Sequence, residues 1–171
     1  MEVIMKFNSL IPELVVSDIE RTKEFYVNIL NFVIEYERSE DKFIFLSLED
    51  NQMMFEQDSG YWSVNKLEYP YGRGVNFEMT VSDVEGLYKR ILGFQIKPFR
   101  QMSISHYRNG DEDIVQKEFL VQDPDGYLLR FTDWLILINP SLRNPHQNDL
   151  SQDAAKTKVE YAWSGCWGLS E

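Results

Sequence analysis

The stretch Val16-Ser17-Asp18-Ile19-Glu20 returns 65 residues later as Val81-Ser82-Asp83-Val84-Glu85. A second match follows at an offset of 62 residues, where Ile29-Leu30-Asn31-Phe32 returns as Ile91-Leu92-Gly93-Phe94. Self-similarity of this kind is the signature of a duplicated structural unit. The offset shortens by three residues, close to one helical turn, so a shorter helix is predicted in the second unit.

Each copy predicts a helix directly after its first match. Ser17 with Glu20, and Ser82 with Glu85, have the Ser-x-x-Glu spacing of a capping box, in which the side chains bond backbone N–H groups that a helix start leaves free. Apolar residues then recur at helical spacing up to the second match. Both units are therefore expected to carry one amphipathic helix.

Runs rich in aromatic and β-branched residues flank both helices and predict strands. They span residues 10–16, 32–37, 43–48 and 53–57 in the first unit, and 75–81, 94–99, 116–121 and 127–134 in the second. Asp123-Pro124-Asp125-Gly126 predicts a tight turn, because Pro presets φ and Gly accepts a positive φ. The predicted fold class is α+β, with two paired βαβββ units whose curved mixed sheets surround a cleft, and a C-terminal extension.

One domain is predicted over residues 1–138, with its units at about 8–57 and 73–134. Residues 139–171 are mostly polar and predict a tail that packs on the domain or on a second subunit. Two stretches, 58–74 and 102–114, combine turn formers with aromatic residues. Both are predicted to be irregular loops at the rim of the cleft, where ligand contacts tend to gather.

The charge balance restricts the partners. The 171 residues carry 17 Lys and Arg against 28 Asp and Glu, a formal net charge of −11. Such a field repels phosphate backbones and anionic lipid surfaces, so neither nucleic acid nor membrane is an expected partner, whereas a cationic small molecule is. A single cysteine forms no internal disulfide, and a soluble, cytoplasmic protein is expected.

Three segments together resemble the vicinal oxygen chelate superfamily, which includes glyoxalase I, extradiol dioxygenases, fosfomycin-resistance enzymes and bleomycin-resistance binding proteins. They are Leu14-Val15-Val16-Ser17-Asp18, the Phe25-Tyr26 pair ahead of Ile29-Leu30-Asn31-Phe32, and residues 118–132. The last segment looks most like bleomycin-resistance proteins. The resemblance covers roughly residues 9 to 135.

In the superfamily's enzymes, four strands supply His, Glu or Gln ligands to a divalent metal. Carried onto this chain, the resemblance puts these positions at Ile11, near Glu56, near Asn76 and at Arg130. Ile has no lone pair, and Arg offers only donors and a fixed positive charge. We therefore expect no metal, no cofactor and no catalytic residue. The alternative is a one-pleat shift to Glu13, Glu56 and Glu78, which could hold Mg²⁺ or Mn²⁺ in a lyase or dioxygenase.

The bleomycin-binding relatives stack a planar cationic drug between aromatic side chains in a crevice at a dimer interface. The resemblance therefore implies a homodimer that binds a small flat molecule without metal, as in antibiotic sequestration, and the acidity of the chain favours a cation. A non-catalytic scaffold whose cleft is filled by its own side chains remains an alternative, and Phe43 and Phe45 could be core residues. The expected ligand contacts are the polar Glu56, Asn76 and Arg130 and the aromatic Phe43, Phe45, Trp62 and Tyr107.

Overall fold

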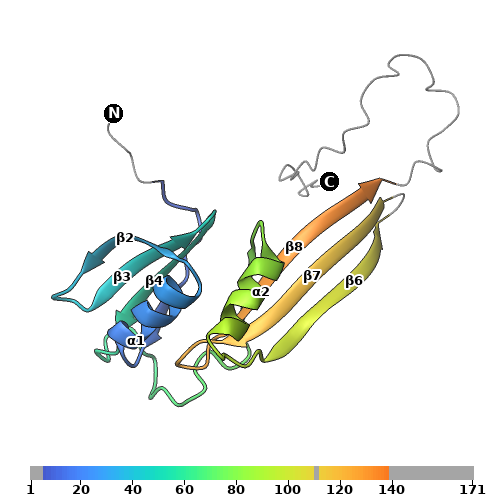
Figure 1. Cartoon of the computed structure of the whole chain (residues 1–171). Helices are drawn as coiled ribbons and strands as arrows, with labels where there is room; N and C mark the ends of the chain where they lie inside the picture. The colour runs from blue at the N-terminus through green and yellow to red at the C-terminus, as the bar shows by residue number, and fades with distance from the viewer. Residues whose placement is uncertain (1–5, 110–111, 139–171) are drawn as a thin grey trace, which may run out of the picture.

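A computed structural model describes residues 6–109 and 112–138 and contains two βαβββ units (Figure 1). The first consists of β1 (Glu13–Val16), α1 (Ile19–Lys23) continued by the π-helical turn η1 (Glu24–Ile29), β2 (Val33–Arg38), β3 (Phe43–Leu48) and β4 (Asn51–Gln57). The second consists of β5 (Asn76–Thr80), α2 (Val84–Gly93), β6 (Arg100–Asn109), β7 (Glu112–Gln122) and β8 (Leu128–Ile138). The predicted α+β fold of paired βαβββ units is confirmed. The tail predicted at 139–171 lies outside the described residues.

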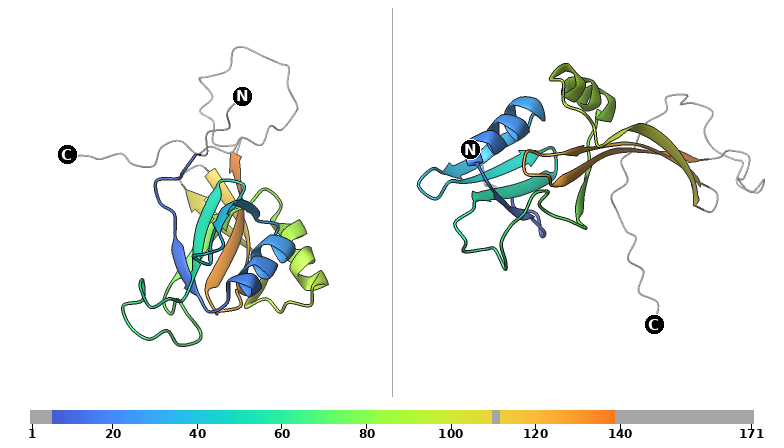
Figure 2. Two further views of the ribbon diagram at one scale, coloured as in Figure 1. Left: turned by 90° about the vertical axis from the view of Figure 1, so that its left-hand side faces the viewer. Right: turned by 90° about the horizontal axis from the view of Figure 1, so that it is seen from below.

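Each unit builds a four-stranded mixed sheet. The strand orders are β1-β4-β3-β2 and β5-β8-β7-β6. The pairs β1/β4 and β5/β8 are parallel, and the other neighbours are antiparallel. Both helices lie on the same side of the sheets (Figure 2). The sheets therefore have one face covered by helices and an opposite face without them, which we call the helix-free face.

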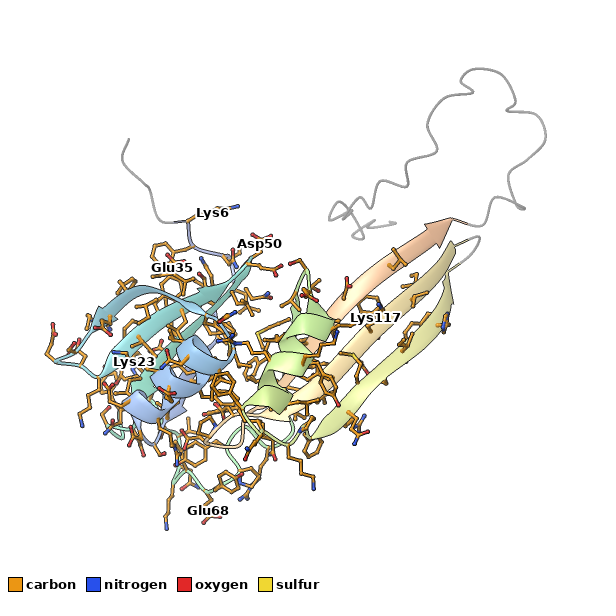
Figure 3. The ribbon with its side chains drawn as sticks, in the orientation of Figure 1. Lys6, Lys23, Glu35, Asp50, Glu68 and Lys117 are labelled. Atoms are coloured by element: carbon orange, nitrogen blue, oxygen red, sulfur yellow. The ribbon has the colours of Figure 1, made fainter. Side chains whose placement is uncertain are left out.

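The hydrophobic core lies between the helices and the sheets. Strand side chains alternate between faces, and every second residue of the inner strands enters the core. The sheets contribute, among others, Leu46, Phe55, Phe119 and Phe131, and the helices contribute residues such as Tyr26 and Ile91. Ion pairs fasten the helices at the surface: Lys23 pairs with Glu37 of β2 and Lys117 of β7 pairs with Glu85 of α2, each at 2.7 Å (Figure 3).

The helices begin one residue later than the capping boxes predict. The N-cap residues are Asp18 and Asp83, whose carboxylates accept backbone N–H groups of the first helical turn. A carboxylate is favoured at this place because it also meets the positive end of the helix dipole. Ser17 and Ser82 are displaced from the cap role, and their hydroxyl groups bond elsewhere.

These two serines join the units in a reciprocal way. Ser17 follows β1 and donates its hydroxyl to Asp125 in the β7–β8 turn at 2.6 Å, and its backbone N–H to the same carboxylate at 3.0 Å. Ser82 follows β5 and donates its hydroxyl to Glu49 in the β3–β4 turn at 2.8 Å, with its N–H again at 3.0 Å. We call these pairs the serine–acid clasps. Each unit thus fixes the helix start of the other.

The second unit differs from the prediction in one region. Residues 94–99 form turns and irregular chain instead of a strand, and residues 102–114, predicted to be an irregular loop, belong to the β6–β7 hairpin. This hairpin pairs from Arg100 opposite Leu120 to Asn109 opposite Glu112. Its strands alternate largely polar residues, so apolar periodicity gave no signal for it. No helix among residues 6–109 and 112–138 is long and apolar enough to cross a membrane.

Candidate functional site

Loop 58–74 joins the two units and is tied to both of them. Its beginning is held by the Asp58 N–H, which donates to the Val16 carbonyl at 2.8 Å. Its end is held by the Tyr71 N–H, which donates to the Asp125 carbonyl at 2.8 Å. The loop is therefore anchored to both units, and the aromatic residues between these anchors have a defined position beside the sheet.

A pocket of about 720 Å³ lies between this loop, the β2–β3 turn and the end of β4. It brings together Glu56 and Trp62, two of the residues predicted to contact a ligand. The Trp62 side chain is 59% exposed, and Tyr61 packs edge-on against it with ring centroids 4.8 Å apart. We call this the Trp62 pocket; it is lined by Glu40, Asp41, Lys42, Glu56, Gln57, Asp58, Ser59, Tyr61 and Trp62.

The Trp62 pocket is strongly acidic. Four carboxylates line it against one lysine. Asp41 is neutralised by an ion pair with Arg38 at 2.8 Å, whereas Glu56 accepts only the Ser59 hydroxyl at 3.3 Å among the described residues. An open aromatic face beside carboxylates attracts a flat cation, because stacking, cation–π attraction and Coulomb attraction act together.

Phe43 and Phe45 point to the helix-free face but are buried beneath other side chains, with exposures of 3% and 0%. Tyr36 contacts both rings, with centroids 5.7 Å from Phe43 and 5.5 Å from Phe45. The Arg38 guanidinium lies 3.9 Å from the Phe43 ring centroid, and Phe7 stacks on Phe45. Neither phenylalanine belongs to the main core cluster, so they form a separate aromatic cluster on the first sheet.

The second sheet carries a charged network on its helix-free face. The Arg130 guanidinium bonds Glu118 at 2.5 Å and pairs with Glu78 at 3.2 Å. The amide of Gln116, which is fully buried, donates to Glu78 at 3.3 Å and accepts from Arg130 at 3.4 Å. The charge of Arg130 is therefore already balanced by protein carboxylates and is not free to bind an anion.

The residues at the implied metal positions do not fit a divalent cation. The Arg130 guanidinium is a fixed positive charge where the fourth ligand would lie, and Ile11 offers no lone pair. Among residues 6–109 and 112–138, no group of three or more His, Cys, Asp or Glu side chains is arranged to hold a metal. Glu13 lies near Glu56, and burial together with this neighbour raises the pKa of Glu13, whereas Glu78 is engaged by Arg130.

The remaining predicted contact residues lie outside the Trp62 pocket. Asn76 is exposed at the start of β5. Tyr107 is 48% exposed on β6, with its ring centroid 6.4 Å from that of Trp134 on β8. Of the seven residues predicted to bind a ligand, the structure therefore gathers Glu56 and Trp62 in one pocket, whereas the other five are distributed over the helix-free face.

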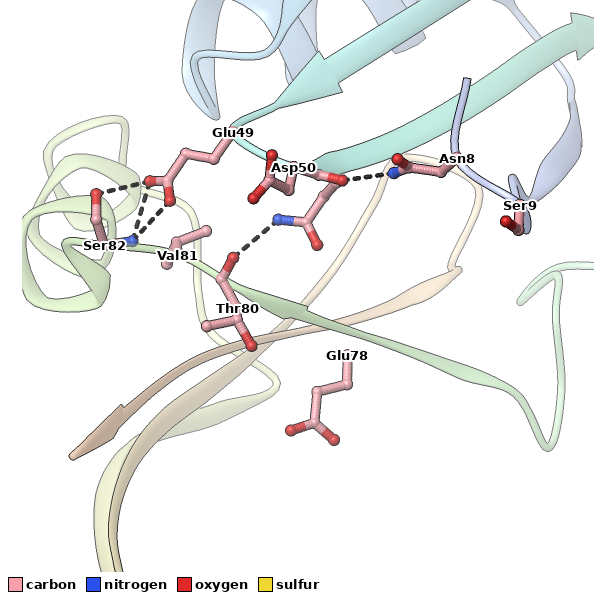
Figure 4. Close-up of a pocket in the computed structure, with 9 residues that line it drawn as sticks. Asn8, Ser9, Glu49, Asp50, Glu78, Thr80, Val81 and Ser82 are labelled. Carbon is pink, nitrogen blue, oxygen red and sulfur yellow. Dashed lines mark hydrogen bonds between the residues drawn. The ribbon is translucent and has the colours of Figure 1, made fainter. Parts of the chain in front are cut away.

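A second cavity of about 670 Å³ lies between the N-terminal segment, the β3–β4 turn and β5 (Figure 4). Its polar groups bond mainly to one another: Asn51 donates to the Thr80 carbonyl at 2.8 Å, and Ser82 donates to Glu49. Sequence reasoning did not identify this cavity, because its wall combines three segments that are distant in the chain.

Sequence reasoning also missed several aromatic residues of the helix-free face. For Trp134 a signal was available, since the two-residue period of β8 puts Arg130, Thr132 and Trp134 on one face. For Phe7 there was none, because it precedes both repeats and its partner Phe45 is known only from the folded chain.

The comparisons with known proteins agree on one family. The family model that describes the Glyoxalase/Bleomycin resistance protein/Dioxygenase superfamily matches residues 6–131. A superfamily member from Vibrio splendidus 12B01 is 34% identical, over 72% of this chain and 95% of that one, with a TM-score of 0.36. No curated protein matches the chain.

Two further solved structures share the fold. A glyoxalase/bleomycin resistance protein/dioxygenase from Alicyclobacillus acidocaldarius is 21% identical, covers 74% of this chain and 91% of its own, and has a TM-score of 0.54. TioX from Micromonospora sp. ML1 is 17% identical, covers 74% of this chain and 98% of its own, and has a TM-score of 0.56. At this level of identity they are similar in fold alone.

Proposed function

Because the chain belongs to the glyoxalase/bleomycin resistance protein/dioxygenase superfamily, we propose that it binds a small flat cation in the Trp62 pocket, without a metal. One observation carries the proposal: the pocket joins an exposed indole to Glu56 and to a surplus of carboxylates. The acidic balance of the whole chain, −11, would concentrate cations near such a pocket.

The proposed mode of binding follows from the chemistry of the lining. A planar ligand would stack on the Trp62 indole, with Tyr61 supporting that ring edge-on. Its positive charge would lie toward Glu56, whose carboxylate has no cationic partner among the described residues. Indole faces attract cations by about 0.5 to 2 kcal/mol, depending on how far water is excluded.

The biological role that we propose is sequestration of a bleomycin-type antibiotic by a cytoplasmic homodimer. The dimer is supported by the resemblance, since the bleomycin-binding relatives complete their crevice at a dimer interface. Sedimentation velocity would test it, and a single monomeric species at high micromolar concentration would contradict the dimer.

The test of the binding function is a titration of metal-stripped protein with the planar cationic dye proflavine and with a bleomycin-type drug. Fluorescence anisotropy follows the dye, and calorimetry follows the drug, each with and without Mn²⁺. Wild type should bind both to a similar extent with and without metal. W62A and E56Q should each lose about threefold to tenfold in affinity, because each removes one attraction of about 1 kcal/mol.

E68Q is the matched control. Glu68 is an exposed glutamate of the same loop that does not line the pocket. Its substitution should leave the affinity unchanged. Equal affinity in wild type, W62A and E56Q would contradict binding in the Trp62 pocket.

A non-catalytic scaffold with a filled face is the second candidate, and one observation favours it. Phe7, Tyr36 and Arg38 already cover Phe43 and Phe45. The metal-dependent lyase or dioxygenase has no comparable support, because Glu13, Glu56 and Glu78 are not arranged as a metal site. Absence of binding to both probes, with and without Mn²⁺, would favour the scaffold.

A further inference from the structure

Phe45 combines two properties that rarely occur together. It lies on the helix-free face, outside the main core cluster, yet its side chain is 0% exposed. Tyr36 packs edge-on against Phe45, and a ring of the N-terminal segment covers it face-on: Phe7 lies parallel to Phe45, with ring centroids 5.5 Å apart and an interplanar angle of 5°. Phe7 itself remains 53% exposed. One aromatic ring thus lies flat on another, with its outer side toward solvent.

The N-terminal segment is held beside the sheet by a small clamp. The Gln52 side chain accepts the Asn8 N–H at 2.8 Å and donates to the Lys6 carbonyl at 2.7 Å. The Asn8 amide donates to the Asp50 carbonyl at 2.6 Å. All three hydrogen bonds join residues flanking Phe7 to the β3–β4 turn or the start of β4. The ring is therefore held by stacking and by a clamp, two of whose three hydrogen bonds depend on the Gln52 side chain.

A second group on the same cluster resembles a ligand in its chemistry. The Arg38 guanidinium, which is planar and positively charged, lies 3.9 Å from the Phe43 ring centroid. Phe7 and Arg38 together show that this cluster accepts both a flat ring and a planar cation on its faces. The protein's own side chains therefore indicate which class of molecule the cluster can bind.

We propose that Phe7 occupies a stacking site for a planar aromatic cation on Phe45 and Tyr36, and that the ligand binds there by displacing Phe7. The proposal deepens the proposed function and rests on it for the class of ligand. Phe43 lies directly opposite Glu56 in the β3–β4 register, so the cluster and the Trp62 pocket share Glu56 as their common border. Phe7 would then control how much of this face is open to the ligand.

Displacement has a measurable consequence. When the binding-competent state is only a fraction of the population, the apparent dissociation constant rises by the inverse of that fraction. If Phe7 covers Phe45 nine-tenths of the time, its removal strengthens binding about tenfold. A ring that formed a wall of the site would act in the opposite direction, since its removal would weaken binding.

Proflavine anisotropy titrations of the full chain test this, with wild type, F7A, F7W and the double variant F7A/F45A. F7A should bind about five to ten times more tightly than wild type, whereas F7W keeps a covering ring and should not gain. F7A/F45A should lose the gain, because the stacking partner is gone. Unchanged or weaker binding by F7A, with a native circular dichroism spectrum, would overturn the proposal.

Q52A gives an independent test if F7A does not fold. It removes two of the three hydrogen bonds of the clamp and changes no ring, so it should also strengthen binding, by about twofold to fivefold. No gain in folded Q52A would then overturn the proposal. The two proposals are tested by different comparisons. The affinity of W62A relative to wild type tests the Trp62 pocket, and the affinity of F7A relative to wild type tests only the Phe45 site.

Discussion

Arg130 lies on β8 between two strands that each bring it a carboxylate, Glu78 from β5 and Glu118 from β7. One positive charge faces two negative charges, and the Gln116 amide completes the network. These oxygen atoms already converge on a cationic group. The positive charge of the guanidinium stabilises the two adjacent carboxylates against their mutual repulsion. A bound metal ion would stabilise them in the same way.

R130H should therefore create a metal site. The substitution removes the internal cation and adds an imidazole nitrogen beside two carboxylates and an amide oxygen, donors that Zn²⁺ and Mn²⁺ accept. Calorimetry should show about one equivalent of metal bound by R130H and no saturable binding by wild type. R130K, which keeps the positive charge, should behave like wild type. Folded R130H without metal binding would contradict this account of Arg130.

At the residue scale, the sequence predicted the strand face on which a side chain lies better than it predicted which other side chains contact it. The two-residue period of β3 correctly puts Phe43 and Phe45 on the face opposite Ile44 and Leu46, which enter the core. It could not predict that Phe7 covers Phe45, because that contact depends on where a segment outside the repeat comes to lie. The ligand roles of all seven predicted contact residues remain predictions, because a ligand contact also depends on surroundings that the period of a strand does not give.

The turn between β7 and β8 is the element with the most unusual electrostatics. Gly126 has a φ of 91°, and its N–H donates to the Asp123 carbonyl at 3.0 Å, which confirms the predicted tight turn. The Asp123 carboxylate accepts the N–H groups of Asp125 and Tyr127 and the Tyr26 hydroxyl. Burial nevertheless raises the pKa of Asp123 to about 6, only partly opposed by these hydrogen bonds.

This pKa predicts how the turn responds to pH. The native state holds the Asp123 proton more tightly than the unfolded state, so the stability from this group is fully present below the unfolded pKa of 3.8 and is lost as pH rises to about 6. The loss should amount to about 2–3 kcal/mol. Urea unfolding of wild type and D123N at pH 4 to 7 measures it. A stability difference between the two proteins that does not change with pH would contradict the prediction.

At the element scale, the strands with a clear hydrophobic pattern were the ones predicted correctly. The strand at Phe43–Leu48 was predicted with its exact bounds, because it is apolar on both faces and bounded by turn formers. Strand β6 and the first residues of β7 were not predicted, since residues such as Ser103 and Ser105 carry no apolar alternation, whereas the predicted strand 116–121 lies within β7. The capping boxes were wrong because Asp18 and Asp83 cap the helices while Ser17 and Ser82 bond to the other unit, and sequence spacing alone does not reveal these distant partners.

At the scale of the whole molecule, the serine–acid clasps connect the two units at matching places. They differ in burial: the Asp125 side chain is almost inaccessible and also pairs with Arg21 at 2.8 Å, whereas Glu49 is exposed. When a buried acceptor is removed, its donors are left without a hydrogen-bond partner, whereas water takes the place of an exposed acceptor. The two clasps should therefore contribute unequally to stability.

D125A should lower the free energy of unfolding by about 2–3 kcal/mol, and E49A by less than about 1 kcal/mol. Urea denaturation measures both, and E68Q serves again as an exposed control. Equal losses in the two variants would contradict the dependence on burial. The repeat predicted that two units exist, but not the clasps, because residues 17 and 125 are far apart in the sequence.

The reciprocal exchange of the clasps bears on how such a chain could arise. Each unit carries one serine and one acceptor turn, and each serine bonds to the acceptor turn of the other unit. A half-length ancestor with the same sequence features would therefore have formed two clasps at once by pairing with an identical copy. Gene duplication and fusion would then have converted that association between molecules into the internal symmetry of this one, after which the two halves of the helix-free face were free to diverge.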